Sequence, residues 1–271
     1  MLVSLKLLLG MSQMQTARQL RIIMGKSFTN IASNLLKKFT RGAPDFTIAP
    51  HEVTQSWVKR LKIDLVVDVG ANEGQFVQLV RQRGFAGRII SFEPLDAAFK
   101  KLTKRFGRDP RWTGVQTALG EKNDTLTMEV AGNALMSSSL LSMLPNHVEA
   151  EPTSAIFRTE RVSVRRLDES LSPFLNGAER LFLKLDTQGF EDHVLKGATG
   201  ILEKVVLLEL ELSLVPLYSG QTLMPEMMNL VASLGFTPVS LDRGFADNLR
   251  GKLLQMDGLF VRNDLVSVDP I

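Results

Sequence analysis

Two short segments carry residues whose types and spacing suit the binding of a nucleotide-like ligand. The first, at positions 65–74, is an apolar run that contains Asp68 and ends in a turn with Gly70 and Gly74. Glycine lets a backbone turn tightly and approach a ligand closely. Because Asn72 stands where the dinucleotide fingerprint needs its second glycine, the spacing disfavours conventional NAD binding.

The second segment, at positions 89–94, is an apolar run that ends in Glu93, 19 residues after Gly74. A carboxylate at the end of the second strand of an open α/β sheet can accept both hydroxyls of a ribose. The alternative is that Glu93 caps the helix that follows Pro94. With the glycine turn at this distance upstream, we favour ribose binding.

A parallel α/β sheet is needed to position these segments, and the remaining sequence predicts one. Short apolar runs alternate with helical stretches, which is typical of this fold class. The predicted strands span 65–69, 88–92, 114–118, 181–185, 205–210, 236–241 and 258–261. Two weaker strand candidates, 126–130 and 161–164, fall in a predicted insertion at about 120–180 on the substrate side.

The charge of the chain is divided unevenly. The 271 residues carry a net charge of +3, but the first 42 contain seven Lys or Arg and no acid. The other 229 residues therefore hold 25 basic and 29 acidic side chains, a net charge of −4. Such a domain offers no broad phosphate-binding surface, so we expect no nucleic-acid partner. The absence of cysteine excludes disulfides, thiolate metal sites and a cysteine nucleophile.

The basic leader predicts an amphipathic helical extension over residues 1–45, followed by the main domain at 46–271. Apolar residues recur at steps of three or four from Leu20 to Phe39, and Gly42 and Pro44 end the pattern. The helix could cover the main domain or a dimer partner, lie on anionic lipid, or serve as an organelle presequence. We expect a cytoplasmic protein, with peripheral membrane contact through residues 1–42 as one option.

Further motifs make the chain similar to the FkbM family of S-adenosylmethionine-dependent methyltransferases over about residues 60–262. The resemblance rests on segments 68–74, 92–94, 118–120, 166–168, 183–189 with Glu191, 195–198 and 208–209. It implies a class I methyltransferase Rossmann-like fold, with a central, mostly parallel seven-stranded sheet and helices on both faces. Gln188 departs from the pattern, because many relatives have Glu there.

Carried over residue by residue, the resemblance implies that S-adenosylmethionine is the cofactor. Asp68, Gly70, Asn72 and Gly74 would surround its methionine part, and Glu93 would hold the ribose. Ala118 and Leu119 would lie near the adenine, where apolar contacts suit a ring. The full predicted cofactor set is Asp68, Gly70, Ala71, Asn72, Gly74, Glu93, Pro94, Ala118 and Leu119.

Family relatives are associated with O-methylation, and a hydroxyl needs a base or a metal to react at neutral pH. Asp186, at the end of the fourth predicted strand, is the first candidate base, although it could instead form an ion pair with Lys184. With Glu209 and Glu211 it could form an acidic floor that binds substrate hydroxyls or a divalent cation. We favour hydroxyls and predict no metal site.

Other polar residues each have two possible roles. His147 could act as a base if the insertion closes over the site, or be a solvated loop histidine. The serines at 137–139 could bind a sugar or simply form a turn, and Tyr218 could contact substrate or pack in the core.

The predicted function is S-adenosylmethionine-dependent transfer of a methyl group to a hydroxyl of a sugar in a glycan, glycolipid or related secondary metabolite. The alternative is a non-catalytic S-adenosylmethionine-binding or scaffold module in carbohydrate assembly. The acceptor and the oligomeric state are not encoded in any motif.

Overall fold

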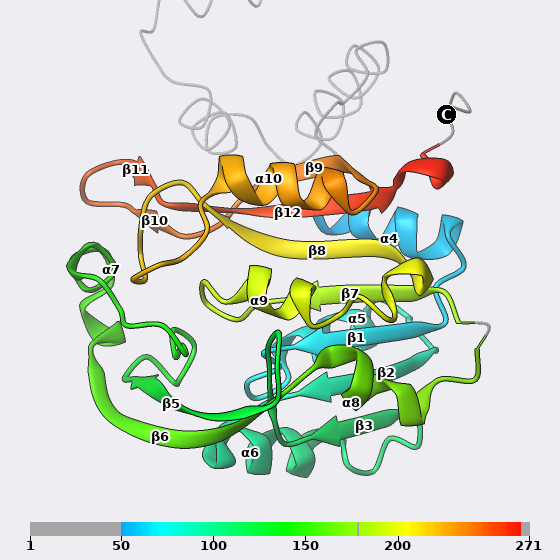
Figure 1. The fold of residues 1–271 in the computed structure, drawn as a ribbon, viewed down its shortest axis with the longest axis horizontal. Coiled ribbons are helices and arrows are strands. Elements are labelled where there is room, and N and C mark those ends of the chain that lie inside the picture. Colours follow the sequence, from blue (N-terminus) through cyan, green and yellow to red (C-terminus); the bar gives the residue numbers. More distant parts are fainter. Residues whose placement is uncertain (1–49, 178, 267–271) are drawn as a thin grey trace, which may run out of the picture. The chain divides into compact units, whose positions relative to one another are not determined.

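The computed structural model describes residues 50–177 and 179–266 (Figure 1). The predicted helix over residues 1–45 lies outside the described residues. A seven-stranded sheet has the order β3-β2-β1-β7-β8-β12-β9. Its strands are β3 (Trp112–Val115), β2 (Arg88–Phe92), β1 (Leu65–Val69), β7 (Leu181–Leu185), β8 (Val205–Ser213), β12 (Gln255–Arg262) and β9 (Phe236–Arg243).

The first five strands in this order are parallel, and β12 is antiparallel to both of its neighbours. This confirms the predicted, mostly parallel sheet. The inner strands are continuous apolar runs because both of their faces are covered. The order reverses direction between β1 and β7, and in open α/β sheets ligands bind at the carboxyl ends of strands beside such a reversal.

Helices cover both faces of the sheet, as alternating side chains along each strand require. Val66 and Phe182 face a core shared with α4 (Pro50–Arg60), α5 (Gln75–Gln82) and α6 (Asp96–Phe106). Val67 and Leu183 face the opposite core, shared with α8 (Leu167–Leu171), α9 (Glu191–Lys196) and α10 (Met224–Ser233). Figure 1 shows these two helix groups on opposite sides of the strands.

The third predicted strand, 114–118, is wrong at its end. The chain leaves the central sheet after Val115, and Ala118–Leu119 forms β4 of a separate three-stranded sheet in the order β4-β6-β5. The hydroxyl of Thr117 helps to fix this departure, since it donates to the carbonyl of Ser163 at 3.0 Å. The two weak candidates are strands and are longer than predicted: β5 (Asp124–Ala131) and β6 (Ile156–Arg165).

Two of the remaining connections lie at the carboxyl ends of the central strands. Between β5 and β6 lie α7 (Pro145–Ala150) and the 3-10 turn η1 (Pro152–Ser154). A small hairpin of β10 (Ala246–Asp247) and β11 (Lys252–Leu253) connects β9 to β12. Three further 3-10 turns are η2 (Ser172–Phe174), η3 (Leu202–Lys204) and η4 (Asn263–Leu265).

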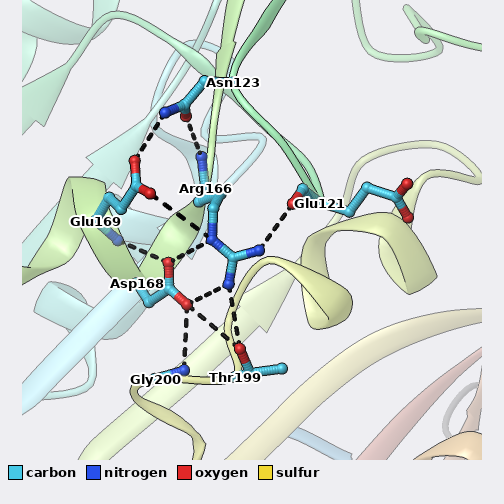
Figure 2. Close-up of polar contacts among 7 residues, drawn as sticks. All are labelled: Glu121, Asn123, Arg166, Asp168, Glu169, Thr199 and Gly200. Carbon is cyan, nitrogen blue, oxygen red and sulfur yellow. Dashed lines mark hydrogen bonds and ion pairs between the residues drawn. The ribbon is translucent and has the colours of Figure 1, made fainter.

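A polar cluster joins the end of the inserted sheet to the loop after α9 (Figure 2). We call it the Arg166 clasp; it comprises Glu121, Asn123, Arg166, Asp168, Glu169, Thr199 and Gly200. Arg166 donates to both oxygens of Asp168, at 3.0 and 2.6 Å, and to the carbonyl of Glu121 at 2.8 Å. The N–H of Gly200 also donates to Asp168, at 3.1 Å. Although burial opposes ionisation, these donors hold the pKa of Asp168 below its usual value.

Within residues 50–177 and 179–266, none of the helices combines the length and apolar character needed to cross a bilayer.

Candidate active site

A cavity of about 740 Å³ opens at the carboxyl ends of the central strands. Its walls come from the turn after β1, the end of β2, the β3–β4 connection, the ends of β7 and β8, and the insertion. Seven residues of the predicted cofactor set line it, whereas Asp68 and Gly74 do not: Gly70, Ala71, Asn72, Glu93, Pro94, Ala118 and Leu119. All three predicted catalytic residues, Asp186, His147 and Glu209, also line it. The structure therefore brings distant segments together at one site.

Close packing requires both glycines of the first motif, and Gly70 also lines the cavity. Gly70 has φ +77°, and a Cβ built on it would lie 1.8 Å from the carbonyl oxygen of Asp186. Gly74 has φ +86°, and its Cβ would lie 2.3 Å from the Phe106 ring on α6. Side chains at these two positions would collide with Asp186, which follows β7, and with α6. The sequence alone had suggested that the glycines allow a ligand to approach.

Glu93 faces the cavity and does not cap α6, since the N-terminus of that helix receives no side-chain capping hydrogen bond. Its two carboxylate oxygens accept hydrogen bonds from the backbone N–H groups of Asn72, at 2.9 Å, and Leu95, at 2.8 Å. It therefore ties the glycine turn to the residue that precedes α6. Burial raises the pKa of Glu93 to about 7, even though both N–H groups oppose the shift. Asn72 has φ +45°, and its Oδ1 is a buried acceptor with no hydrogen-bond partner.

Asp68 lies behind the lining of the cavity and is fully buried. It accepts a hydrogen bond from Ser91 Oγ at 3.3 Å, and its Oδ1 lies 3.7 Å from Lys184 Nζ. Burial raises its pKa, and the charge of Lys184 opposes that shift. Asp68 can therefore form an ion pair with Lys184 from behind the cavity wall.

Four carboxylates on three neighbouring strands form what we call the acidic floor: Asp186, Glu209, Glu211 and Asp257. Among the residues that the structure describes, Lys184 is the one cation that lines the cavity with them, and its Nζ lies 3.0 Å from Asp186 Oδ2. The ion pair that the sequence offered as an alternative role for Asp186 is therefore present. Burial alone would lower the pKa of Lys184, but Asp186 and Asp68 raise it above its usual value.

The other three carboxyl groups of the acidic floor have raised pKa values. Burial raises the pKa of Glu209 to about 7, and the nearby Asp257 and Asp186 add to the shift. The pKa values of Glu211 and Asp257 are also raised, chiefly by burial and then by Asp186. At neutral pH the floor can therefore both accept hydrogen bonds and take up a proton.

Gln188 connects the acidic floor to the insertion. Its Nε2 donates to Asp186 Oδ1 at 3.0 Å and to Glu211 Oε2 at 2.8 Å. Its Oε1 accepts a hydrogen bond from the hydroxyl of Tyr218 at 2.8 Å, and Tyr218 also contacts the carbonyl of Ser137 at 3.0 Å. An amide can donate to two carboxylates, whereas the Glu found in many relatives would add a third negative charge.

His147 is not a solvated loop histidine, so that reading is wrong. It lies on α7, is 2% exposed, and packs its ring against Tyr218 and Phe245 at centroid distances of 5.3 and 5.0 Å. Its Nε2 lies 3.0 Å from Ser137 Oγ, and its Nδ1 has no hydrogen-bond partner. Burial lowers the pKa of His147 to about 4, so the ring is neutral at pH 7.

Sequence reasoning missed Asp257 and Gln255 as lining residues. Asp257 lies one residue before the predicted strand 258–261, and its register partner in β8 is Glu211. Gln255 Nε2 lies 3.3 Å from Glu211 Oε2. The only signal was an acid beside a strand, and no local pattern told which strand it would pair with. Among residues 50–177 and 179–266, no three His, Asp or Glu side chains are grouped so that they could hold a metal ion.

Comparison with known proteins gives a family. A sequence profile described as the methyltransferase FkbM domain matches residues 68–238. No curated protein sequence matches the chain.

Solved structures resemble the fold only distantly. A putative O-methyltransferase from Klebsiella pneumoniae is 12% identical, with a TM-score of 0.45 over 82% of this chain and 84% of that one. An rRNA methylase from Streptococcus thermophilus is 11% identical, with a TM-score of 0.43 over 80% and 98%. A 1,6-didemethyltoxoflavin-N1-methyltransferase from Burkholderia thailandensis is 14% identical, with a TM-score of 0.42 over 86% and 88%. Similarity at this level does not identify an acceptor.

Proposed function

The chain belongs to the FkbM methyltransferase family, whose methyl donor is S-adenosylmethionine, and from this we propose that it methylates a sugar hydroxyl. The acceptor would be a glycan, a glycolipid or a related secondary metabolite. The observation that carries the proposal is the acidic floor, which meets the turn after β1 in one cavity.

The lining of the cavity fits the cofactor. Asn72 Oδ1 is an orphan acceptor, Glu93 ends β2 with a carboxylate, and Ala118 and Leu119 supply an apolar end. We assign the methionine part to the turn of Gly70–Asn72 and the ribose to Glu93 beside Pro94. When bound, the cofactor supplies an electrophilic methyl group on a sulfonium centre. The protein's tasks are then to orient the acceptor and to exclude water.

The acidic floor supports a neutral polyhydroxyl acceptor. Carboxylate oxygens accept hydrogen bonds from hydroxyls and so orient them. Asp186 is paired with Lys184 at 3.0 Å, and a pKa of about 7 suits Glu209 to take up a proton near neutral pH. We therefore assign proton acceptance to Asp186 or Glu209 and a supporting role to His147, whose low pKa makes it a weak base.

The same charge supports the prediction that nucleic acid is not the acceptor. Four carboxylates around one lysine repel a phosphate that approaches them. A non-catalytic S-adenosylmethionine-binding or scaffold module is the alternative, and it would need the cofactor residues but not the acidic floor.

The test is mass spectrometry of a glycolipid extract incubated with the protein and isotope-labelled S-adenosylmethionine. We expect one added labelled methyl group on a sugar. Asp186→Asn should lower turnover about 100-fold and retain affinity for S-adenosylhomocysteine. The matched control is Asp96→Asn, which changes an exposed surface ion pair with Lys100. Full turnover in Asp186→Asn would remove Asp186 from the reaction, and cofactor binding without any transfer would favour the scaffold alternative.

Peripheral membrane contact through the acid-free leader, residues 1–42, remains part of the proposal. Deletion of these residues should weaken association with anionic vesicles. Unaltered association would leave the leader without that role.

A further inference from the structure

Large apolar side chains that are exposed to solvent gather on one side of the described residues. There are five: Leu79 (37% exposed), Met136 (54%), Phe157 (60%), Leu241 (40%) and Leu249 (95%). Single exposed apolar residues are ordinary on protein surfaces. Here, however, all five lie toward the carboxyl ends of the central parallel strands, where the cavity opens.

The register and the cavity lining establish this placement. Leu79 and Met136 line the cavity. Leu241 pairs with Gly258, which pairs with Leu210, which in turn pairs with Leu185, the last residue of β7. Phe157 is the second residue of β6, and Figure 1 shows the start of β6, α7 and the β10–β11 hairpin at the same end of the sheet.

The most exposed of the five, Leu249, lies in the turn of the β10–β11 hairpin, and basic residues are close to it in the sequence. Arg250 and Lys252 follow it, and Arg243 donates to Asn248 Oδ1 at 3.0 Å. Asp247, the one acid of the hairpin turn, is buried and accepts a hydrogen bond from Arg250 at 2.7 Å. The turn therefore presents an apolar tip beside Arg243 and Lys252, whereas the charge of Arg250 is balanced by Asp247.

The hairpin is held firmly beside the cavity. Phe245, just before β10, packs its ring 5.0 Å from that of His147 on α7. Arg250 also pairs with Glu149 of α7 at 3.4 Å. The base of the hairpin is thus attached to α7, and Phe245 itself lines the cavity.

We propose that this edge of the domain, led by the hairpin tip at Leu249 and assisted by Phe157, docks on an anionic lipid surface. An apolar tip with adjacent cations suits the boundary between headgroups and acyl chains. Phe157 also has a cation beside it, since the guanidinium of Arg158 lies 5.4 Å from its ring, and Arg158 pairs at the same time with Glu160 at 2.8 Å. The inference rests on the proposed glycolipid acceptor. It adds that the protein would bind this acceptor at the membrane surface, with the sugar facing the acidic floor. It does not depend on the leader.

The test uses the full chain with one fluorescent probe. Because the sequence has no cysteine, Leu249→Cys provides a single labelling site for an environment-sensitive dye. With vesicles of phosphatidylcholine and phosphatidylglycerol, the dye should shift to the blue and be quenched by brominated acyl chains. The control is Arg108→Cys, an exposed site in the turn between α6 and β3 at the opposite end of the sheet. It should show neither effect.

A dye at position 249 that does not respond would overturn the proposal, even if the chain sediments with vesicles through its leader. So would a vesicle-free dimer that requires Leu249, because a second copy would then be the partner of this edge.

Two variants measure the contributions separately. Leu249→Asp should lower the vesicle partition coefficient about tenfold, and Lys252→Glu about threefold, with the second loss removed by high salt. Arg108→Glu should change it less than either. Equal partition of all three proteins contradicts the proposal. Titration with S-adenosylhomocysteine on the same samples separates the two claims: retained cofactor binding without lipid insertion overturns only the docking surface, and lipid insertion without cofactor binding overturns only the proposed function.

Discussion

The Arg166 clasp and the acidic floor are both half-buried clusters of charged side chains, yet they are built in opposite ways. In the clasp, Asp168 faces two N–H groups of Arg166 and the N–H of Gly200, and its pKa is lowered. In the floor, four carboxylates surround one lysine, and the pKa values of Glu209, Glu211 and Asp257 are raised.

The difference separates a structural role from a functional one. A charge-assisted, bidentate pair with all of its acceptors used stabilises the fold and fixes its geometry. Carboxylates crowded without enough donors cost stability, and such groups gather where chemistry needs them. We therefore assign the clasp to the attachment of the insertion and the floor to the acceptor.

The largest effect should come from breaking the clasp. Asp168→Ala removes both carboxylate oxygens that accept from Arg166 and Gly200, and it leaves the half-buried guanidinium with only the carbonyl of Glu121 and the hydroxyl of Thr199 as acceptors. We expect the free energy of unfolding in urea to fall by about 3 kcal/mol, with little change in S-adenosylhomocysteine affinity. Glu169→Ala, at a largely exposed member of the same cluster, should cost less than about 0.5 kcal/mol. If Asp168→Ala left the free energy of unfolding unchanged, the clasp would have no structural role.

A second substitution should worsen the crowding of the floor. Gln188→Glu replaces the amide that donates to Asp186 and Glu211 with a fifth carboxylate beside the four of the floor. We expect a loss of about 2 kcal/mol in stability at about pH 8 that is largely recovered at about pH 5, where the carboxyls share protons.

Gln188→Met is the matched control, because it removes the hydrogen bonds without adding charge. Its loss of stability should depend little on pH. If both variants respond to pH equally, repulsion in the floor is not the cause.

The smallest effect should be a gain in the free energy of unfolding. The folded carboxyl of Glu209 has a pKa of about 7, above the 4.5 of the free side chain, so the folded state holds a proton that the unfolded chain releases. Stability from this group is therefore lost as pH rises from about 4.5 to about 7. Glu209→Gln should raise the free energy of unfolding by about 1 kcal/mol at about pH 8 and leave it unchanged at about pH 4.5. A destabilised Glu209→Gln at high pH would contradict the raised pKa.

The sequence predicted the parts of the fold that local patterns determine. The strands at 65–69, 88–92 and 181–185 are found at the predicted residues, because each is a short apolar run buried on both faces. The turn at Gly70 and the start of α5 at Gln75 also follow from neighbouring residues. The ends of elements were predicted less well: the chain leaves the central sheet after Val115, and contacts of Thr117 and β4 with β6 decide its path.

The parts of the site that were missed depend on contacts between distant segments. His147 is buried because Tyr218 and Phe245, far along the chain, close over it. Asp257 joins the floor because β12 inserts antiparallel between β8 and β9, and no local pattern specifies that pairing.

The central claim is that the cavity with the acidic floor, and not the clasp, is the cofactor and acceptor site. Isothermal titration with S-adenosylhomocysteine tests it most directly. We predict one site per chain, weakened about thirtyfold in Glu93→Ala, less in Glu93→Gln, and unchanged in Asp168→Asn measured below its unfolding temperature. No binding by the unaltered protein, or an equal loss in Glu93→Ala and Asp168→Asn, would contradict the account.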